Sequence, residues 1–409
     1  MQASRQFDVI VYGATGFTGS LVAEYLLQRY GCGKDLDWAI AGRSKDKLEE
    51  LKKRLGNEAA ELTAIVADSN DKESLAFLAA HTRVVLTTVG PYALYGSRLV
   101  AACVEAGTDY CDLAGEVQWI RRMIDKHHDA AKETGARIVH CCGFDSVPMD
   151  IGLHFLQQEA KQRHGAYCQD VALFVKAMKG TASGGTLASM VNTIREARQD
   201  RSIARMLANP YALNPAGARD GPDGRDQMSV RYDDDAGCWT APFVMAIVNT
   251  RVVRRSHALA GFPYGRDFRY REAVMTGPGA GGWLKGNMVT LTLGGLATGL
   301  SFAPSRRLLQ ALVLPEPGDG PDAEARESGF FNLMQVGKLE DGTTMRTRIT
   351  GDRDPGYGST SKMLAESAVC LAGDEIAAGG GVLTPASAMG DALLKRLRDN
   401  AGLTFDVLD

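Results

Sequence analysis

The stretch "FDVIVYGATGFTG", from Phe7 to Gly19, decides the fold. A run of β-forming residues leads into Gly13, Gly16 and Gly19, and an apolar-faced helix is predicted over residues 17–30. In such a strand-turn-helix unit the first glycine permits the tight turn, the second lets a pyrophosphate approach the backbone, and the third lets helix and strand pack closely. A plain glycine turn is the alternative, but the flanking strand and helix favour a dinucleotide-binding loop.

The same turn presents backbone donors at the start of a helix. A helix N-terminus attracts anions because its first N–H groups lack acceptors within the helix and because the positive end of the helix dipole lies there. The N–H groups predicted to face a phosphate belong to Ala14, Thr15, Gly16 and Phe17.

The residues that follow alternate strands with helices. Strands are predicted at 35–43, 62–68, 83–90, 108–112 and 136–142, and helices at 45–55, 71–80, 94–106 and 116–133. This alternation is typical of a doubly wound parallel sheet with right-handed crossovers, whose ligands bind outside the carboxyl ends of the strands. The predicted fold class is therefore α/β, with an N-terminal NAD(P)-binding Rossmann domain and a second α/β (α+β) domain.

A chain of 409 residues exceeds what one hydrophobic core usually organises. We expect a Rossmann domain over residues 1–147, a substrate or oligomerisation domain over 148–354, and a helical segment over 355–409 that packs back on the Rossmann domain. The formal net charge of −3 leaves no basic excess, so we expect no nucleic-acid partner. No secretory signal precedes the first strand and the eight cysteines lack regular spacing, so we expect reduced thiols in the cytoplasm.

The end of the second predicted strand discriminates between the nicotinamide cofactors. An NAD site typically has an acidic residue there, which hydrogen-bonds the ribose 2′-hydroxyl. Arg43 and Ser44 stand at this position, and a guanidinium with a hydroxyl suits a 2′-phosphate, so the sequence favours NADP(H). The alternative is that Arg43 only faces solvent. Asp68, which ends the third strand, is predicted either to contact the adenine amino group or to cap the next helix.

The segment "TTVGPYALYG" follows the fourth predicted strand, where a Rossmann domain meets the nicotinamide half of its cofactor. Gly90 lets the backbone pass close to the ring, and Pro91 fixes a turn. Tyr92 is a candidate proton donor, and aromatic packing beneath a helix is the alternative for it.

The segment "RIVHCCGFDSVPMDIG" leaves the sixth predicted strand. His140, Cys141 and Cys142 do not indicate a metal site, because neighbouring side chains on a strand point to opposite faces and structural zinc wants four ligands. Phe144 is predicted to pack near the nicotinamide. Asp145 is predicted either to cap the following helix or to orient a carboxamide or a proton donor.

Several of these segments carry a family resemblance. "GATGFTG", "AGRS", "VGPYALYG", "CDLAGE", "CGFDSVPMDIG" and the tail segment "DPGYGSTSKMLAESAVCLA" resemble the saccharopine dehydrogenase-like oxidoreductases, the group that contains the mycobacterial trans-acting enoyl reductases. The resemblance spans nearly the whole chain. It implies NADPH-dependent reduction of a carbon–carbon double bond in a lipid- or polyketide-linked acyl group, as in glycolipid synthesis.

Two alternative functions stay open at this point. A saccharopine dehydrogenase-type enzyme would act on a C–N bond between amino acids, but the second domain shows no clear cluster of arginines for a dicarboxylic substrate. A non-catalytic nucleotide-binding scaffold at membranes or lipid stores is the second alternative. We expect an apolar substrate, either a small molecule or linked to an acyl carrier, and a homodimer.

Residues 287–304 form an uncharged stretch between Lys285 and Arg306. We interpret it as a buried strand and helix, because apolar runs in soluble proteins are usually core. Contact with lipid at the inner face of the plasma membrane is the alternative. The run "RYDDD", Arg231 to Asp235, is predicted to be a solvated charge run.

Overall fold

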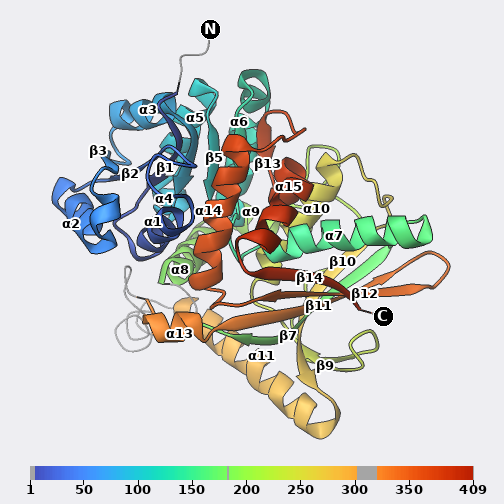
Figure 1. Ribbon diagram of the computed structural model, residues 1–409. Coiled ribbons are helices and arrows are strands. Elements are labelled where there is room, and N and C mark those ends of the chain that lie inside the picture. Colours follow the sequence, from blue (N-terminus) through green and yellow to red (C-terminus); the bar gives the residue numbers. More distant parts are fainter. Residues whose placement is uncertain (1–4, 182–183, 302–319, 409) are drawn as a thin grey trace. The chain divides into compact units, whose positions relative to one another are not determined.

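The computed structural model describes residues 5–181, 184–301 and 320–408 (Figure 1). The chain divides into two compact units, each built on its own seven-stranded sheet. The first unit holds the residues up to Val147 together with 356–401, and the second holds most of the chain between them together with 402–408. The predicted fold class is confirmed: one sheet is fully parallel and the other is mixed.

The first sheet has the strand order β13-β6-β5-β4-β1-β2-β3, and all its pairings are parallel. Its strands are β1 (Phe7–Tyr12), β2 (Trp38–Gly42), β3 (Thr63–Val66), β4 (Thr82–Thr87), β5 (Asp109–Asp112), β6 (Arg137–Val139) and β13 (Gly381–Leu383). Val9, Ile10 and Val11 of β1 are completely buried. A near-continuous apolar strand is what a parallel sheet covered on both faces requires.

The helices of the first unit connect these strands and cover the sheet. They are α1 (Phe17–Tyr30), α2 (Lys45–Leu55), α3 (Lys72–His81), α4 (Tyr92–Tyr95), α5 (Ser97–Ala106), α6 (Val117–Thr134), α14 (Gly358–Gly373) and α15 (Pro385–Asp399), with a short 3₁₀ turn η1 (Asn57–Ala59). Right-handed crossovers place α1 and α2 on one face and α3, α5 and α6 on the other. Helix α14 packs against α1 and against β1, β4 and β5, so it completes the face that α1 begins.

A buried carboxylate fastens α14 to the rest of the first unit. Glu366 of α14 is fully buried and accepts hydrogen bonds from the hydroxyls of Tyr25 and Tyr30 on α1, both at 2.6 Å. Arg396 of α15 lies 3.1 Å from the same carboxylate, and Asn400 donates to it at 3.1 Å. A buried charge is tolerable only when it is paired and hydrogen-bonded, and these four groups meet that condition.

The second sheet has the order β14-β12-β11-β7-β10-β9-β8, with only β7 and β10 parallel among its pairs. Its strands are β7 (Asp170–Lys179), β8 (Arg231–Asp233), β9 (Cys238–Ala241), β10 (Arg269–Gly277), β11 (Phe330–Lys338), β12 (Thr344–Gly351) and β14 (Leu403–Leu408). Residues 403–408 were included in the predicted C-terminal helical segment. They instead form β14, because Leu403 and Phe405 are buried against β12 in this sheet.

The helices of the second unit are α7 (Val147–His164), α8 (Gly184–Gln199), α9 (Arg201–Leu207), α10 (Ala246–Leu259), α11 (Gly279–Ser301) and α13 (Ala323–Glu327). Helix α10 is buried along most of its length and carries three buried arginines. These arginines were not recognised as a cluster from the sequence. Arg254 pairs with Asp223 at 2.6 Å and donates to the carbonyl oxygens of Pro210 and Tyr270. Arg251 pairs with Asp226, so α10 holds the irregular segment before β8 in place.

One prediction for the second unit holds only in part and another is wrong. In the "RYDDD" run Arg231 and Asp234 are exposed as predicted, but Asp233 is buried and pairs with Arg271 at 2.5 Å. Residues 287–301 belong to one helix, α11, in which Met288 is 61% and Leu291 is 75% exposed. The apolar residues of α11 surround the helix, so packing against β9 and β10 leaves many of them outside. The rest of the predicted stretch, residues 302–304, and Arg306 lie outside the described residues.

Candidate cofactor and active site

The predicted site segments all follow the carboxyl ends of strands in the first sheet. The glycine loop follows β1, Arg43 follows β2, and Asp68 follows β3. The segments that carry Tyr92 and Asp145 follow β4 and β6. Because the strands are parallel, these segments emerge at a single edge of the sheet, which is where open α/β sheets bind their ligands.

The glycine loop leaves no room for side chains at two of its glycines. Gly13 has φ = 89°, and a Cβ atom there would lie 2.7 Å from Cγ2 of Val89. A Cβ atom on Gly19 would lie 2.2 Å from the carbonyl oxygen of Gly13. The first helix therefore approaches the β1 turn as closely as backbone allows, which is the arrangement that the glycine spacing predicts.

Some backbone N–H groups of this loop already have acceptors within the protein, and one does not. The N–H groups of Gly13 and Ala14 donate to the carbonyl oxygen of Ala41 at 2.9 and 3.2 Å, and that of Gly16 donates to Gly13 at 3.0 Å. The N–H of Thr15 has no acceptor among the described residues. Thr15 is thus the loop residue whose N–H is most directly available to a phosphate.

The ends of β2 and β3 carry the groups that would read the adenosine half of a cofactor. Arg43 is exposed and makes no hydrogen bond or ion pair with another described residue. Ser44 accepts the Lys47 N–H at 3.3 Å and so caps α2. Asp68 accepts the Asn70 N–H at 2.8 Å, whereas the cap of α3 is Asp71. The cap alternative weighed for Asp68 therefore does not apply.

The segment after β4 is tied to the neighbouring loops through Tyr92. Its buried hydroxyl donates to the carbonyl oxygen of Thr87 at 3.2 Å and accepts the N–H of Leu113 at 3.1 Å. Burial raises the pKa of this hydroxyl well above its ordinary value. The Tyr92 ring stacks on Trp119 with centroids 5.7 Å apart. Gly90 and Pro91, joined by a cis peptide bond, precede it.

Glu116 is a site residue that the sequence did not single out. Its fully buried carboxylate accepts the N–H groups of Tyr92 at 2.8 Å and Ala93 at 3.3 Å, so it caps α4 from the loop after β5. The only sequence signal is its place in "CDLAGE", since a contact across 24 residues leaves no local pattern.

A second buried carboxylate, Asp112, joins the ends of β5 and β6. It accepts hydrogen bonds from the Tyr110 hydroxyl at 2.8 Å and from the N–H groups of Ala114 and Cys141 at 2.9 and 3.2 Å. Its other contact is Nδ1 of His140 at 2.8 Å. Cys141 donates its thiol to the carbonyl oxygen of Ala114 at 2.8 Å. His140 and Cys141 thus anchor the loop that leads to Asp145.

The loop from Cys141 to Ser146 is held in a strained conformation. Cys141 has φ = 64° and Ser146 has φ = 126°, and both values are uncommon outside glycine. Gly143 packs so tightly that a Cβ atom would lie 2.6 Å from Leu113. The N–H of Phe144 donates to Oγ1 of Thr360 at 3.0 Å. Strain of this kind persists only where the surrounding structure fixes it, as Asp112 and Thr360 do here.

Asp145, which is half-buried, differs from the buried carboxylates Asp112 and Glu116. Its carboxylate makes no hydrogen bond or ion pair with any described residue. Removal from water raises its pKa from the ordinary 3.8 to about 6. A carboxyl group with this pKa can hold and release a proton near neutral pH, which suits acid or base chemistry.

These features together define a Rossmann-type NAD(P)-binding oxidoreductase fold. Residues 9–139 match the saccharopine dehydrogenase NADP binding domain. The chain is 42% identical, over 96% of both sequences, to a Mycobacterium tuberculosis protein named as a candidate trans-acting enoyl reductase. It is 40% identical to a trans-acting enoyl reductase of the same organism, over 97% of this chain and 96% of the relative.

The fold agrees with a solved structure. Apo saccharopine dehydrogenase (L-Glu forming) from Saccharomyces cerevisiae superposes with a TM-score of 0.54 at 14% identity, covering 98% of this chain and 100% of that one. The chain therefore belongs to the saccharopine dehydrogenase-like oxidoreductases, in the group of the trans-acting enoyl reductases. It is an NADP(H)-dependent oxidoreductase, which confirms the predicted family and cofactor.

The residues present fit NADP(H). Because Gly13 and Gly19 have no side chains, the turn after β1 stays open to a pyrophosphate. The N–H of Thr15 is available there as a donor. At the end of β2, where an NAD site would carry a carboxylate, stands the unpaired guanidinium of Arg43. A cofactor bound here would therefore meet a cation at its 2′-phosphate.

Replacing Arg43 with alanine tests this assignment. If its guanidinium pairs with the 2′-phosphate, Arg43→Ala should lower the affinity for NADPH by about 1.5 to 3 kcal/mol, the range for hydrogen bonds to charged groups, and hardly change that for NADH. Titration calorimetry with both cofactors measures the difference. Arg54→Ala, at the other end of α2, is the matched control. Equal losses for NADPH and NADH would refute the assignment.

Proposed function

We propose that the protein reduces the carbon–carbon double bond of an apolar, unsaturated acyl thioester with NADPH. The observation that carries this proposal is the 40–42% identity, over nearly the whole chain, to proteins named as trans-acting enoyl reductases. We further propose a lipid- or polyketide-linked acyl group as substrate, presented on an acyl carrier, and a place in lipid metabolism such as glycolipid biosynthesis.

NADPH would supply a hydride to the β-carbon of the substrate. The protein must then provide a proton for the α-carbon and a donor for the developing enolate oxygen. Asp145 suits the first task, because its carboxyl has no other described partner and its pKa is raised to about 6. Tyr92 was the other candidate from the sequence. Its hydroxyl proton already bonds to Thr87, which supports a positioning role for Tyr92 in the loop after β4.

The C–N alternative has less support in the second unit. A dicarboxylic amino acid substrate would need arginines free to bind its carboxylates. The buried arginines of α10 are engaged internally: Arg251 pairs with Asp226, Arg254 with Asp223, and Arg255 donates to the carbonyl oxygen of Leu213. The similarity to yeast saccharopine dehydrogenase is a similarity of fold at 14% identity, and it does not support a C–N substrate.

Turnover separates an enzyme from a nucleotide-binding scaffold. Incubation with NADPH and a long-chain enoyl thioester should consume many equivalents of NADPH per protein chain and yield the saturated thioester, measured by absorbance and mass spectrometry. Saccharopine with NADP⁺ should give no reaction. Consumption limited to a single equivalent or less, across carrier-linked and free thioesters, would support the scaffold instead.

Asp145→Asn tests the proton donor. The carboxyl is protonated below a pH of about 6, so proton-limited turnover of the wild type should fall about tenfold for each pH unit above that value. The variant should lose turnover on the order of 100-fold and lose this pH dependence. Asp129→Asn, at an exposed position on α6, is the control. Unchanged turnover in Asp145→Asn would remove Asp145 from the mechanism.

Stability distinguishes this role from a helix cap. Because folding raises the pKa of Asp145, its charge costs stability as pH rises from about 4 through 6. Asp145→Asn should therefore melt at the same or a higher temperature than the wild type at pH 7. If Asp145 only capped α7, the substitution would lower stability by up to about 1 kcal/mol and leave turnover nearly intact.

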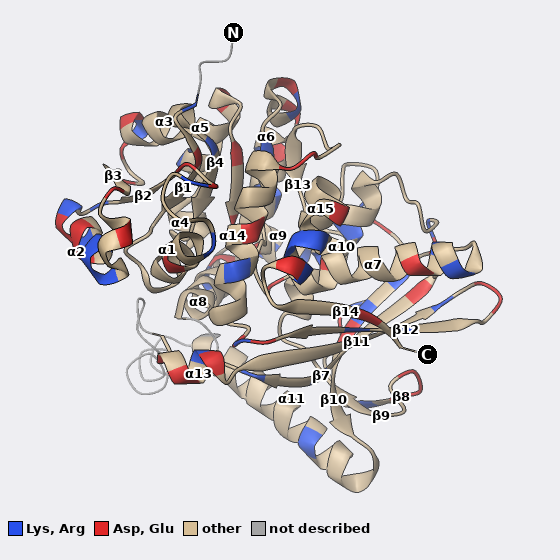
Figure 2. Ribbon diagram, in the orientation of Figure 1, with Lys and Arg blue, Asp and Glu red and all other residues tan. Residues whose placement is uncertain are grey.

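We also propose a cytoplasmic protein that contacts the inner face of the plasma membrane through α11. No helix among the described residues is long and apolar enough to cross a membrane. Helix α11 exposes Trp283, Leu284 and Leu291, and Figure 2 shows it almost free of charge, with Lys285 as its one charged residue. An exposed apolar helix that is almost free of charge suits insertion at a bilayer surface. The homodimer expected from the sequence stays a prediction.

Flotation with anionic liposomes tests the contact. Wild type should float with the vesicles at low salt, and Leu291→Asp should float much less, because a buried carboxylate opposes insertion of the apolar face. Met228→Asp, at a loop position 76% exposed in the same unit, is the control. Failure of the wild type to float, or equal flotation of Leu291→Asp, would contradict the proposal.

A further inference from the structure

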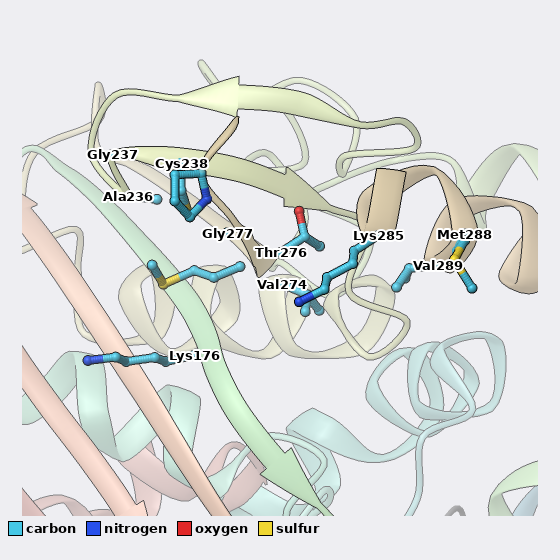
Figure 3. Close-up of a pocket in the computed structure, with 12 residues that line it drawn as sticks. Lys176, Ala236, Gly237, Cys238, Val274, Thr276, Gly277, Lys285, Met288 and Val289 are labelled. Atoms are coloured by element: carbon cyan, nitrogen blue, oxygen red, sulfur yellow. The ribbon is translucent and has the colours of Figure 1, made fainter. Parts of the chain in front are cut away.

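The second unit contains a cavity of about 770 Å³ between α11, β7, β9 and β10 (Figure 3). Ligand pockets for small molecules typically measure about 300 to 1,000 Å³, so it could hold a molecule of that size. Its lining residues are Lys176, Ala236, Gly237, Cys238, Val274, Met275, Thr276, Gly277, Pro278, Lys285, Met288 and Val289. Every one of them belongs to the second unit.

The cavity arises from the glycine-rich turn between β10 and α11. Gly277 has φ = 106°, and the pairing of β9 with β10 shifts register between Met275 and Gly277. A Cβ atom on Gly282 would lie 1.9 Å from the carbonyl oxygen of Gly277, so the first turn of α11 is pressed against the end of β10. The sequence directs α11 back across the sheet here, and Met288 and Val289 become the far wall.

The walls of this cavity are mainly hydrocarbon. Val274 and Met275 come from β10, Cys238 from β9, and Met288 and Val289 from α11. The Thr276 hydroxyl donates to the carbonyl oxygen of Trp239 at 3.0 Å. An apolar chain could replace water along these walls without leaving that hydroxyl unpaired.

Two lysines give the cavity a positive charge. Neither Lys176 nor Lys285 forms a hydrogen bond or ion pair with a described residue, and the lining contains no Asp or Glu. Figure 3 shows Lys285 reaching from α11 toward Val274, whereas Lys176 on β7 points its ammonium group away from Lys285. By contrast, Lys338 of the same sheet pairs with Asp235 at 2.5 Å. The charge of Lys338 is thus neutralised, and the charges of the two cavity lysines are not.

We infer that this cavity binds one amphipathic anion, with a long acyl chain along its apolar walls and a carboxylate or phosphate against Lys285, while Lys176 adds to the positive charge of the lining. An apolar wall alone would accept any hydrocarbon, and two exposed lysines alone would accept any anion. Their combination in one cavity selects a molecule that carries both features. The inference is independent of the reductase chemistry, because its residues lie in the second unit and binding needs no NADPH.

Calorimetric titration of the full chain tests this inference, without NADPH and with each probe below its micelle concentration or its solubility limit. Dodecanoate should bind saturably at one per chain, and each methylene removed from the chain should weaken binding by about fourfold. Neutral 1-dodecanol should bind more weakly than dodecanoate. Dodecyl phosphate is the second anionic probe: tighter binding than dodecanoate identifies a phosphate headgroup as the source of the charge, and weaker binding identifies a free carboxylate.

Two variants separate charge from shape. Lys176→Gln with Lys285→Gln should weaken dodecanoate binding at least tenfold and leave 1-dodecanol binding unchanged, whereas Lys72→Gln on α3 should change neither. Val289→Trp, which fills the cavity, should weaken both probes. NADPH affinity should stay at the wild-type value in each variant and so report intact folding. Absence of saturable dodecanoate binding, or unchanged binding in both cavity variants, would overturn the inference.

Discussion

The close approach of backbone to backbone at Gly13 is the constraint on which the first unit depends. Its carbonyl oxygen accepts the Gly16 N–H at 3.0 Å and the Thr88 hydroxyl at 3.2 Å, and a Cβ atom on Gly19 would lie 2.2 Å from it. One peptide group thereby fixes the turn after β1, the loop after β4 and the start of α1. Side chains at these glycines would force the three apart and close the space that a pyrophosphate needs.

Two buried carboxylates extend that arrangement toward the reaction site. Glu116 holds the start of α4, and Asp112 holds the loop after β6 through His140 and the backbone of Cys141. Each makes several hydrogen bonds, as a buried charge must. Asp145 lies near the end of this supported, strained loop and makes no hydrogen bond with a described residue, and removal from water raises its pKa. A rigid loop that carries a carboxyl of raised pKa is the physical basis for the proposal that Asp145 takes part in the chemistry.

The sequence predicted what depends on local pattern. Three features can be recognised within short stretches of sequence: the glycine loop, the alternation of strands and helices, and the absence of an acidic residue after β2. They predicted the fold class, the family and the cofactor. Other features could not be predicted because each joins residues far apart in the chain. They are the contacts of Glu116, the contact between Asp112 and His140, and the pairing of β13 with β6. The apolar run in α11 was wrongly predicted to be buried, because apolar residues are buried only where another surface covers them.

The central claim is that the first unit delivers hydride from NADPH to the β-carbon of an enoyl thioester. Deuterium tracing tests it most directly, using each C4-deuterated stereoisomer of NADPH in turn. The account predicts that one stereoisomer places a single deuterium on the β-carbon of the saturated product, with the α-carbon proton drawn from solvent. Oxidation of NADPH with no deuterium at the β-carbon from either stereoisomer would contradict it.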